Sequence, residues 1–234
     1  MIKTITMGYS DTTLTLKLYK DKIYNLVFLR VKEEKTKLLE DYLQKAMEIS
    51  GAYGGRMIAN FDVIEARTKH MNPNAIRIFE WSDLNSRNRA FNSDEFKEIH
   101  PLREVALSEL KIGFFSVKKT QEIHLCSKKI YEIAGFTLFS ETNPKLVIER
   151  YYQIPEANQE IIGNTKPKII TSFEPSNSHQ QATYEHQTQC IVERDIAWEK
   201  ISLLANEEKK RKSYPVIMSP IKSSDTVFAT IVSA

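Results

Sequence analysis

Glycine is scarce in this sequence, with seven among 234 residues. None of the seven forms GxGxxG, and none forms GxxxxGK followed by Ser or Thr. These are the two glycine-rich loops whose backbone N–H groups hold nucleotide phosphates. Binding of dinucleotides or nucleoside triphosphates through such loops is therefore excluded.

Cysteine and long apolar runs are also scarce. Cys126 and Cys190 are the only cysteines and do not form CxxC, which is typical of a reduced, intracellular protein. The N-terminus lacks the continuous apolar segment of a secretory signal, and no run of 18 apolar residues occurs. We therefore expect a cytoplasmic protein that is neither secreted nor inserted in a membrane.

Neither sign of charge is in excess. The 33 basic and 30 acidic residues give a net charge of +3, whereas nucleic-acid-binding proteins usually concentrate basic residues on one face. RNA binding on the face of a β-sheet would also need an RNP1-like strand, which Lys111-Ile-Gly113-Phe-Phe resembles only superficially. We expect no nucleic-acid partner.

Side chains that bind metals or attack carbonyl carbons are not grouped. His124 and Cys126 merely share a strand face, and His179, His186 and Cys190 lack the compact spacing of a zinc site. No GxSxG occurs, and neither cysteine adjoins a base. The sequence therefore predicts no metal and no cofactor.

The apolar residues follow two periods. Thr12–Tyr19 alternates leucines with polar residues, which is typical of a half-buried strand. Lys35–Ser50 has the 3-4-3 spacing of an amphipathic helix. The rest of the first half is expected to contain strands over Ile23–Lys32, Arg56–Arg67, Ala75–Asp83 and Lys111–Lys119, and a helix over Asn85–Leu107 that Pro101 can break.

The second half repeats this layout. Thr13–Tyr24 and Thr120–Tyr131 align at an offset of 107 residues (131 − 24), with Thr, Leu, Lys, Ile and Tyr in common. We interpret the chain as an internal duplication, with domains at 1–119 and 120–234. The second copy is expected to contain strands over Tyr131–Ser140, Lys168–Phe173, Thr183–Glu193 and Asp225–Ser233, and helices over about 144–162 and 198–213.

Each half thus reads β-α-β-β-α-β with one strand in front. This order predicts an α+β fold of two ferredoxin-like repeats, each an antiparallel sheet with both helices on one face. The other sheet face must also bury its apolar residues, and two copies do so by packing those faces together. The duplication supplies both copies as an intrachain pseudodimer, and further homo-oligomers are left open.

Several motifs resemble a known family. Gly54-Gly55-Arg56, Ile78-Phe79-Glu80-Trp81, Phe91-Asn92-Ser93-Asp94-Glu95-Phe96 and Pro101-Leu102-Arg103 are similar to the motifs of a small uncharacterised family in the dimeric α/β-barrel superfamily. The resemblance covers about Ile23–Lys119, and the second copy departs from it, with Asn164-Thr165 in place of Gly-Arg. The superfamily includes cofactor-free oxygenases, isomerases, haem enzymes and non-catalytic proteins, so the resemblance implies an architecture more than an activity.

Seven residues in or beside these motifs are candidates for a site. The catalytic candidates are Glu80 and His100, and the ligand-binding candidates are Arg56, Asn60, Trp81, Asp83 and Arg103. Along the second strand, Met57, Ala59, Phe61 and Val63 are expected to face the helices, and Arg56, Ile58, Asn60 and Asp62 the barrel interior. A few polar groups in an apolar cavity are typical of small-ligand sites.

Each role has a structural alternative. Arg56 could form an ion pair with Glu80 or Asp83 at a strand end, and Glu80 could simply face solvent. His100, beside the helix break, could be a satisfied structural histidine. Trp81 could be a core residue.

The leading functional hypothesis is a protein that binds a small apolar or aromatic metabolite in the cavity of the first repeat, with enzyme activity left open. For an enzyme, the resemblance favours a cofactor-free isomerase or oxygenase, in which Arg56 anchors an anionic group and Glu80 or His100 moves a proton. The alternative is a non-catalytic interaction protein whose barrel is filled by its own side chains. Its strands Thr12–Tyr19 and Thr120–Ser127 would then offer edges for assembly or a partner.

Overall fold

The structure is a computed structural model of the whole chain. It describes residues 13–69, 71–139, 143, 168–176, 182–184, 186, 188–194 and 221–232, the last range without the side chains of 221–223. The helices expected over about 144–162 and 198–213 lie outside the described residues.

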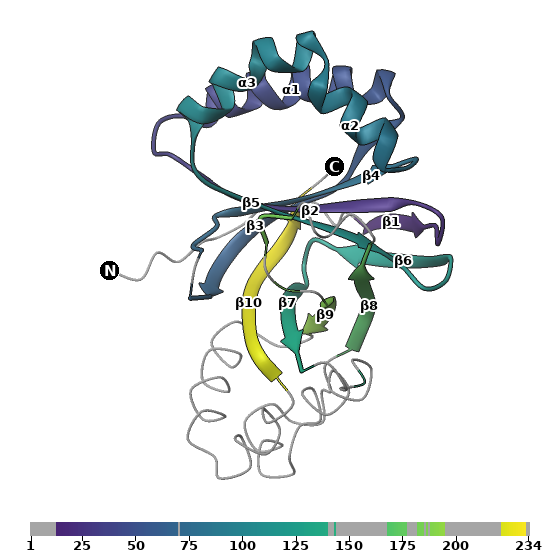
Figure 1. Cartoon of the computed structure of the whole chain (residues 1–234). Coiled ribbons are helices and arrows are strands. Elements are labelled where there is room, and N and C mark those ends of the chain that lie inside the picture. Colours follow the sequence, from purple (N-terminus) through teal and green to yellow (C-terminus); the bar gives the residue numbers. More distant parts are fainter. Residues whose placement is uncertain are drawn as a thin grey trace, which may run out of the picture.

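The first repeat is a four-stranded antiparallel sheet with its helices on one face (Figure 1). The strand order β3-β4-β2-β5 is that of a ferredoxin-like unit, because the first strand lies between the third and the fourth. In chain order the elements are β2 (Ile23–Val31), α1 (Thr36–Ala52), β3 (Gly55–Arg67), β4 (Ala75–Trp81), α2 (Leu84–Asn92), α3 (Asp94–Ala106) and β5 (Leu107–Ser116).

The second repeat has the same strand order, β8-β9-β7-β10. Its first strand is displaced from β2 by 107 residues at both ends (130 − 23 and 138 − 31), which confirms the predicted offset. The strands are β7 (Ile130–Leu138), β8 (Lys168–Pro175), β9 (Thr188–Arg194) and β10 (Ile221–Val232). The strand predicted from Thr183 therefore begins five residues later.

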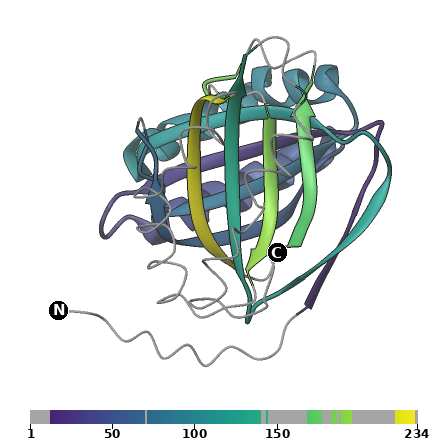
Figure 2. The ribbon, with the colours of Figure 1, turned by 90° about the horizontal axis from the view of Figure 1, so that it is seen from below.

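The two sheets join edge to edge into one closed barrel. β5 pairs with β8 and β10 pairs with β3, so each repeat covers the open edges of the other. Figure 2 shows the strands of the second repeat crossing over those of the first. The barrel interior is a packed core to which both repeats contribute, with Phe28, Phe61, Tyr131, Ile133, Phe173, Tyr184, Ile191 and Val227 among its members.

The strand in front of each repeat forms a separate two-stranded ribbon. β1 (Thr13–Leu18) pairs antiparallel with β6 (Gln121–Cys126), and Leu16 lies opposite Ile123, its own counterpart at the 107-residue offset. The inward side chains of the ribbon, which include Leu16, Leu18, Ile123 and Leu125, join the barrel core. The ribbon therefore marks the approximate two-fold axis that relates the repeats.

A buried tyrosine ties the ribbon to the barrel in each repeat. The Tyr24 hydroxyl accepts a hydrogen bond from the Tyr19 backbone N–H (2.6 Å), and the Tyr131 hydroxyl accepts one from the Cys126 backbone N–H (2.6 Å). Both pairs are five residues apart and are related by the 107-residue offset. Burial raises the pKa of Tyr131 to about 12 and raises the pKa of Tyr24 further above its ordinary value.

The predicted helix over Asn85–Leu107 is two helices, and the break predicted at Pro101 is wrong. The chain breaks at Ser93, whose hydroxyl caps α3 by accepting a hydrogen bond from the Phe96 N–H (3.2 Å). Pro101 lies inside α3, where its ring removes one backbone donor without ending the helix. The following strand begins at Leu107, four residues before the predicted start.

The facing predicted for the second strand is confirmed for Ile58, which lies in the barrel core, and is wrong from Ala59 onward. A β-bulge lies between Met57 and Ala59 in the pairing of β3 with β4, and one extra residue reverses the alternation of faces. Ala59, Phe61 and Val63 therefore pack in the barrel core and not against the helices.

The raised tyrosine pKa values predict how stability depends on pH. An unfolded tyrosine loses its proton near pH 10, whereas folded Tyr131 keeps its proton up to about pH 12. Between these values the folded state binds more protons, so the free energy of unfolding falls as pH rises. Urea unfolding followed by circular dichroism from pH 8 to 12 should show this fall, and Tyr131→Phe should make it shallower.

Tyr53→Phe, at the part-exposed end of α1, is the control for that series. Its pH profile should match that of the unsubstituted protein. Equal slopes for Tyr131→Phe and the unsubstituted protein would contradict the prediction.

Candidate functional site

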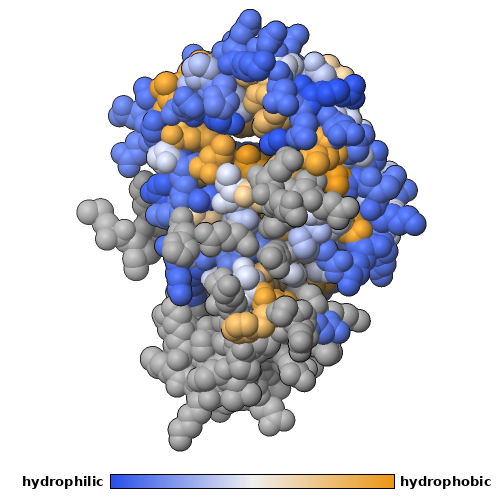
Figure 3. Space-filling view, viewed as in Figure 1, coloured by the Kyte–Doolittle hydropathy of each residue, from blue (hydrophilic) through white to orange (hydrophobic). Residues whose placement is uncertain are grey.

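The candidate site is a cavity between the helices and the first sheet. Its volume is about 60 Å³. Figure 3 shows hydrophobic side chains around a hollow between the helix layer and the sheet. The lining residues come from β2, β4, β5 and all three helices: Asn25, Val27, Leu29, Leu39, Tyr42, Leu43, Ala46, Ser50, Arg77, Phe79, Trp81, Arg87, Phe91, Phe96, Arg103, Leu107, Leu110 and Ile112.

The alternation of side chains along β2 and β4 determines which residues form the floor of the cavity. Side chains alternate between the two faces of a strand. The residues on the face toward the helices are Asn25 and Val27 of β2 and Arg77, Phe79 and Trp81 of β4. The intervening residues of both strands face the barrel core. One sheet therefore serves two compartments, a packed barrel on one face and a cavity on the other.

The roof of the cavity is formed by the helices, and capping residues fix where α2 and α3 begin. Asp83 caps α2 by accepting hydrogen bonds from the Ser86 N–H (2.7 Å) and hydroxyl (3.2 Å), and Ser93 starts α3 one residue after α2 ends. The break between the helices allows Arg87 of α2 and Arg103 of α3 both to reach the cavity.

Aromatic rings form much of the wall. Phe91 and Phe96 lie 4.3 Å apart between ring centroids, and Phe96 meets Tyr42 edge to face at 6.4 Å. Phe91 also meets Trp81 edge to face at 6.0 Å. Burial raises the pKa of Tyr42, so its hydroxyl stays protonated and can act as a hydrogen-bond donor.

The position of Trp81 depends on a glycine in the family-like motif. Gly55 lies opposite Trp81 in the β3–β4 register, and a Cβ atom at Gly55 would lie 2.4 Å from the indole Cζ3 atom. Only a residue without a side chain leaves room for the indole. Gly54, with φ of +81°, makes the tight entry into the strand that glycine allows.

Arginines give the cavity positive charge. The Arg87 guanidinium carbon lies 3.9 Å above the centroid of Phe91 and 4.9 Å from that of Phe114. Burial, and then the nearby charge of Arg103, lowers the pKa of Arg87 to about 10. Burial also lowers the pKa of Arg77, and the charge of Asp62 opposes that change. Among the lining residues that the structure describes, none is Asp, Glu or His.

Four lining side chains have polar atoms without a partner. Among the described residues, no hydrogen bond reaches either amide atom of Asn25, the indole N–H of Trp81, or the Nε atoms of Arg77 and Arg87. Asn25 is 3% exposed and Trp81 is 1% exposed. Buried polar atoms in folded proteins are nearly always satisfied, so this group suits the polar atoms of a ligand.

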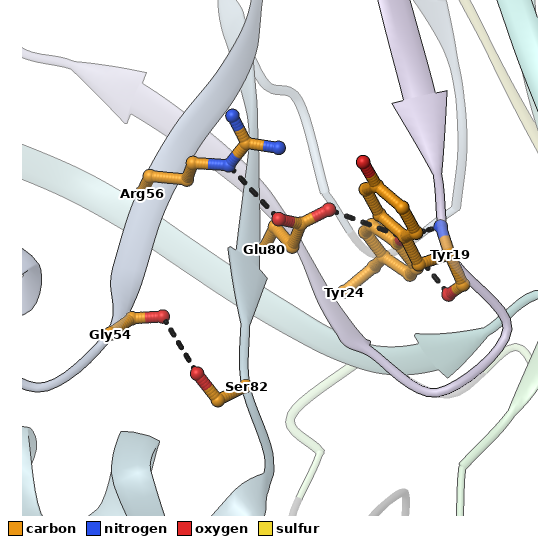
Figure 4. Close-up of polar contacts among 6 residues, drawn as sticks. All are labelled: Tyr19, Tyr24, Gly54, Arg56, Glu80 and Ser82. Atoms are coloured by element: carbon orange, nitrogen blue, oxygen red, sulfur yellow. Dashed lines mark hydrogen bonds and ion pairs between the residues drawn. The ribbon is translucent and has the colours of Figure 1, made fainter.

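Two of the seven predicted site residues, Trp81 and Arg103, line the cavity. Arg56 and Glu80 do not, because they form an ion pair at the barrel end (Nε–Oε1 2.9 Å; Figure 4). Glu80 also accepts a hydrogen bond from the Tyr24 hydroxyl at 3.3 Å. The alternative of an ion pair between Arg56 and Glu80 is therefore confirmed.

The other three predicted residues lie outside the cavity as well. Asp83 caps a helix, and His100 lies on α3 beside Arg103 and 3.4 Å from a carboxylate oxygen of Glu104. Asn60 lies opposite Arg77 in the β3–β4 register, with its side-chain oxygen buried and, among the described residues, unpartnered.

The cavity does not lie inside the barrel, where the sequence predicted the site. The residues that face the barrel interior are packed together in one core, and the bulge in β3 turns Asn60 and Asp62 away from it. The cavity lies on the opposite face of the same sheet.

Asn25, Arg77 and Arg87 were not predicted as site residues. Asn25 and Arg77 are single polar residues inside otherwise apolar strands, IYNLVFLRV and AIRIFEW, and this mismatch is a signal visible in the sequence. Nothing local distinguishes Arg87 from Arg89, its neighbour on the same helix. The choice between them depends on which side of α2 faces the sheet.

Residues 22–112 match the model of a family described as "Domain of unknown function (DUF1330)". The matched residues cover most of the first repeat. The match lies almost entirely within the predicted range Ile23–Lys119, so the resemblance to an uncharacterised dimeric α/β-barrel family is confirmed. A search of curated proteins finds no match to the chain.

A solved structure shows the same architecture. The crystal structure of an anthrone oxidase-like protein matches with 9% identity and a TM-score of 0.54, over 93% of this chain and 94% of that chain. A full-length match of this kind confirms the fold of two ferredoxin-like repeats.

Two other matches cover less than half of this chain. A conserved protein of Methanosarcina mazei Go1 is 25% identical over 42% of this chain and 93% of its own, with a TM-score of 0.31. A variant of SnoaB, a cofactor-independent oxygenase from Streptomyces nogalater, is 14% identical over 43% of this chain and 96% of its own, with a TM-score of 0.33.

The described part of the chain has neither a cluster of metal ligands nor a membrane-spanning helix. In it, no three His, Cys, Asp or Glu side chains come together as a set of metal ligands. None of the helices described has the length and apolarity needed to span a bilayer.

The ion pair at the barrel end predicts a coupled effect on stability. Arg56 is 61% exposed in its side chain, whereas Glu80 is 8% exposed, so removing Arg56 leaves a buried carboxylate. Arg56→Ala should lower the free energy of unfolding by about 1–2 kcal/mol in the otherwise unsubstituted protein. The same substitution should have a much smaller effect in a protein that already carries Glu80→Gln. Urea unfolding of the four proteins measures the coupling, and strictly additive effects would contradict it.

Proposed function

We propose that the first repeat binds a small, largely apolar or aromatic molecule in the cavity between the helices and the sheet. The observation that carries the proposal is the coexistence of aromatic walls with buried polar atoms that have no partner in the described residues. Small-ligand sites are mostly apolar and contain a few convergent polar groups that orient the ligand.

The size of the cavity restricts how the ligand lies. The volume of about 60 Å³ is less than the roughly 150 Å³ of a cavity that takes benzene. An aromatic ring is therefore accommodated when the helix layer moves away from the sheet, or when part of the ring extends into the hollow seen in Figure 3. The helices contact the sheet through side chains, so a small displacement of α2 and α3 is the simplest adjustment.

The same cavity supports cofactor-free isomerase or oxygenase chemistry as the catalytic form of the proposal. Arg87 and Arg103 would stabilise negative charge that develops on the ligand, and Tyr42 would donate a hydrogen bond to it. With no carboxylate or histidine among the described lining residues, the proton would pass to solvent. Two of the structurally similar proteins are described as an anthrone oxidase-like protein and a cofactor-independent oxygenase.

The roles predicted for Arg56, Glu80 and His100 are not part of this proposal, because their side chains do not line the cavity. Arg103 and Trp81 keep ligand-binding roles in it. In this proposal the arginines of the helices, and not Arg56, bind an anionic group of the ligand.

A non-catalytic interaction protein is the second candidate. The specific observation in its favour is the barrel interior, where the described side chains of both repeats pack together in one core. The ribbon of β1 and β6 would provide the partner surface in that case.

Filling the cavity distinguishes the two candidates. Ala46 is 5% exposed and lines the cavity, so Ala46→Leu would occupy part of the ligand volume. Ligand-observed NMR with a panel of small aromatic acids, phenols and amides should detect binding to the unsubstituted protein and at least a tenfold loss in Ala46→Leu. Oxygen uptake with each binding compound tests the catalytic form.

Arg56→Ala is the matched control, because it changes a side chain on the opposite face of the same sheet. It should bind every compound as the unsubstituted protein does. Equal binding by Ala46→Leu and the unsubstituted protein, or no binding by any compound, would overturn the proposal and favour the interaction protein.

A further inference from the structure

The two repeats can be compared residue by residue through their strand registers. Tyr24 lies opposite Glu80 in the first repeat, and Tyr131 lies opposite Glu193 in the second. One residue further along each strand, Asn25 corresponds to Glu132 and Trp81 corresponds to Arg194. The comparison therefore matches two floor residues of the cavity with two residues on the equivalent face of the second sheet.

At these positions the second repeat contains a buried ion pair. Arg194 donates from Nε to the Glu132 carboxylate at 2.9 Å and also donates from a terminal nitrogen. The two side chains are 13% and 2% exposed. In the second sheet the negative charge of Glu132 is therefore already paired with the positive charge of Arg194.

The first repeat has neutral side chains at the same two positions. The Asn25 amide and the Trp81 indole N–H are buried, and neither has a hydrogen-bond partner among the described residues. Both present N–H donors on the cavity side of the sheet. An oxygen atom between them would accept both hydrogen bonds and satisfy two buried groups at once.

The charges around the cavity favour an anionic oxygen over a neutral one. Phe114 lies opposite Asn25 in the β2–β5 register, and the Arg87 guanidinium lies against the Phe114 ring, so a cation is near the unpartnered amide. No lining residue among those described carries negative charge. A partly buried arginine is costly without a counter-charge, and an anionic ligand would provide one.

We propose that the ligand of the first repeat is an organic anion, a carboxylate or an enolate, whose charged oxygen lies between Asn25 and Trp81. It takes the place that the Glu132 carboxylate takes in the second repeat. This inference rests on the proposed binding function and adds the charge of the ligand and the position of its anionic group. The second repeat, with Glu132 built in, does not take the same anion at the equivalent place.

Benzoate and benzamide test the charge, because they have the same ring and nearly the same shape. Isothermal titration calorimetry at pH 7.5 should give at least a tenfold lower Kd for benzoate than for benzamide. Equal affinities would overturn the anion inference while leaving the proposed binding function intact. Binding of neither compound, together with no binding across the aromatic panel, would overturn both.

Substitutions test the position of the anion. Asn25→Asp places a tethered carboxylate where the ligand's anion is proposed to lie, so benzoate affinity should fall at least tenfold and benzamide affinity should change less. Trp81→Phe keeps a ring but removes the N–H donor, and Arg87→Gln removes the cation, so each should reduce the preference for benzoate over benzamide.

Arg89→Gln is the matched control for Arg87→Gln, since Arg89 lies on the same helix, is exposed and does not line the cavity. It should keep the unsubstituted preference. Glu132→Gln in the second repeat should likewise leave benzoate binding to the first repeat unchanged. An unchanged preference for benzoate over benzamide in all three first-repeat variants would overturn the proposed position of the anion. Urea unfolding of each variant shows that the comparison is between folded proteins.

Discussion

The edge-to-edge pairing of the two sheets is the constraint on which the rest of the structure depends. Each sheet ends in edge strands that must be paired or covered, and β5–β8 and β3–β10 provide that pairing within one chain. Closure turns one face of every strand toward a shared interior, which side chains of both repeats then fill. The opposite face is left to the helices, and this is why the cavity lies there.

The sheet of the first repeat therefore carries two kinds of polar group with different roles. Glu80, on the barrel side, is held by Arg56 and the Tyr24 hydroxyl, and it belongs to the tie between barrel and ribbon. Arg77 and Trp81, on the helix side, keep buried polar atoms that nothing described in the chain satisfies. Residues next to each other in β4 thus lie on opposite faces of the sheet, Glu80 in an ion pair and Trp81 beside the cavity.

Much of the fold could be predicted from the sequence, because periodicity and the 107-residue repeat specify strand order and pairing in both halves. The cavity was harder to predict. Glu80 and Arg56 stand in conspicuous motifs, yet the strand parity places them on the barrel side. The bulge beyond Met57 reverses that parity with no clear mark in the sequence, and the side of α2 that faces the sheet selects Arg87 over Arg89. Such choices depend on tertiary packing.

The pairing of two repeats in a single chain has an evolutionary consequence. In a symmetric homodimer one codon specifies two positions, so a change that improves one pocket also changes the other. A fused gene removes that restriction. One half is free to acquire an internal salt bridge, as with Glu132 and Arg194, while the other half keeps the neutral side chains of Asn25 and Trp81 at the same positions.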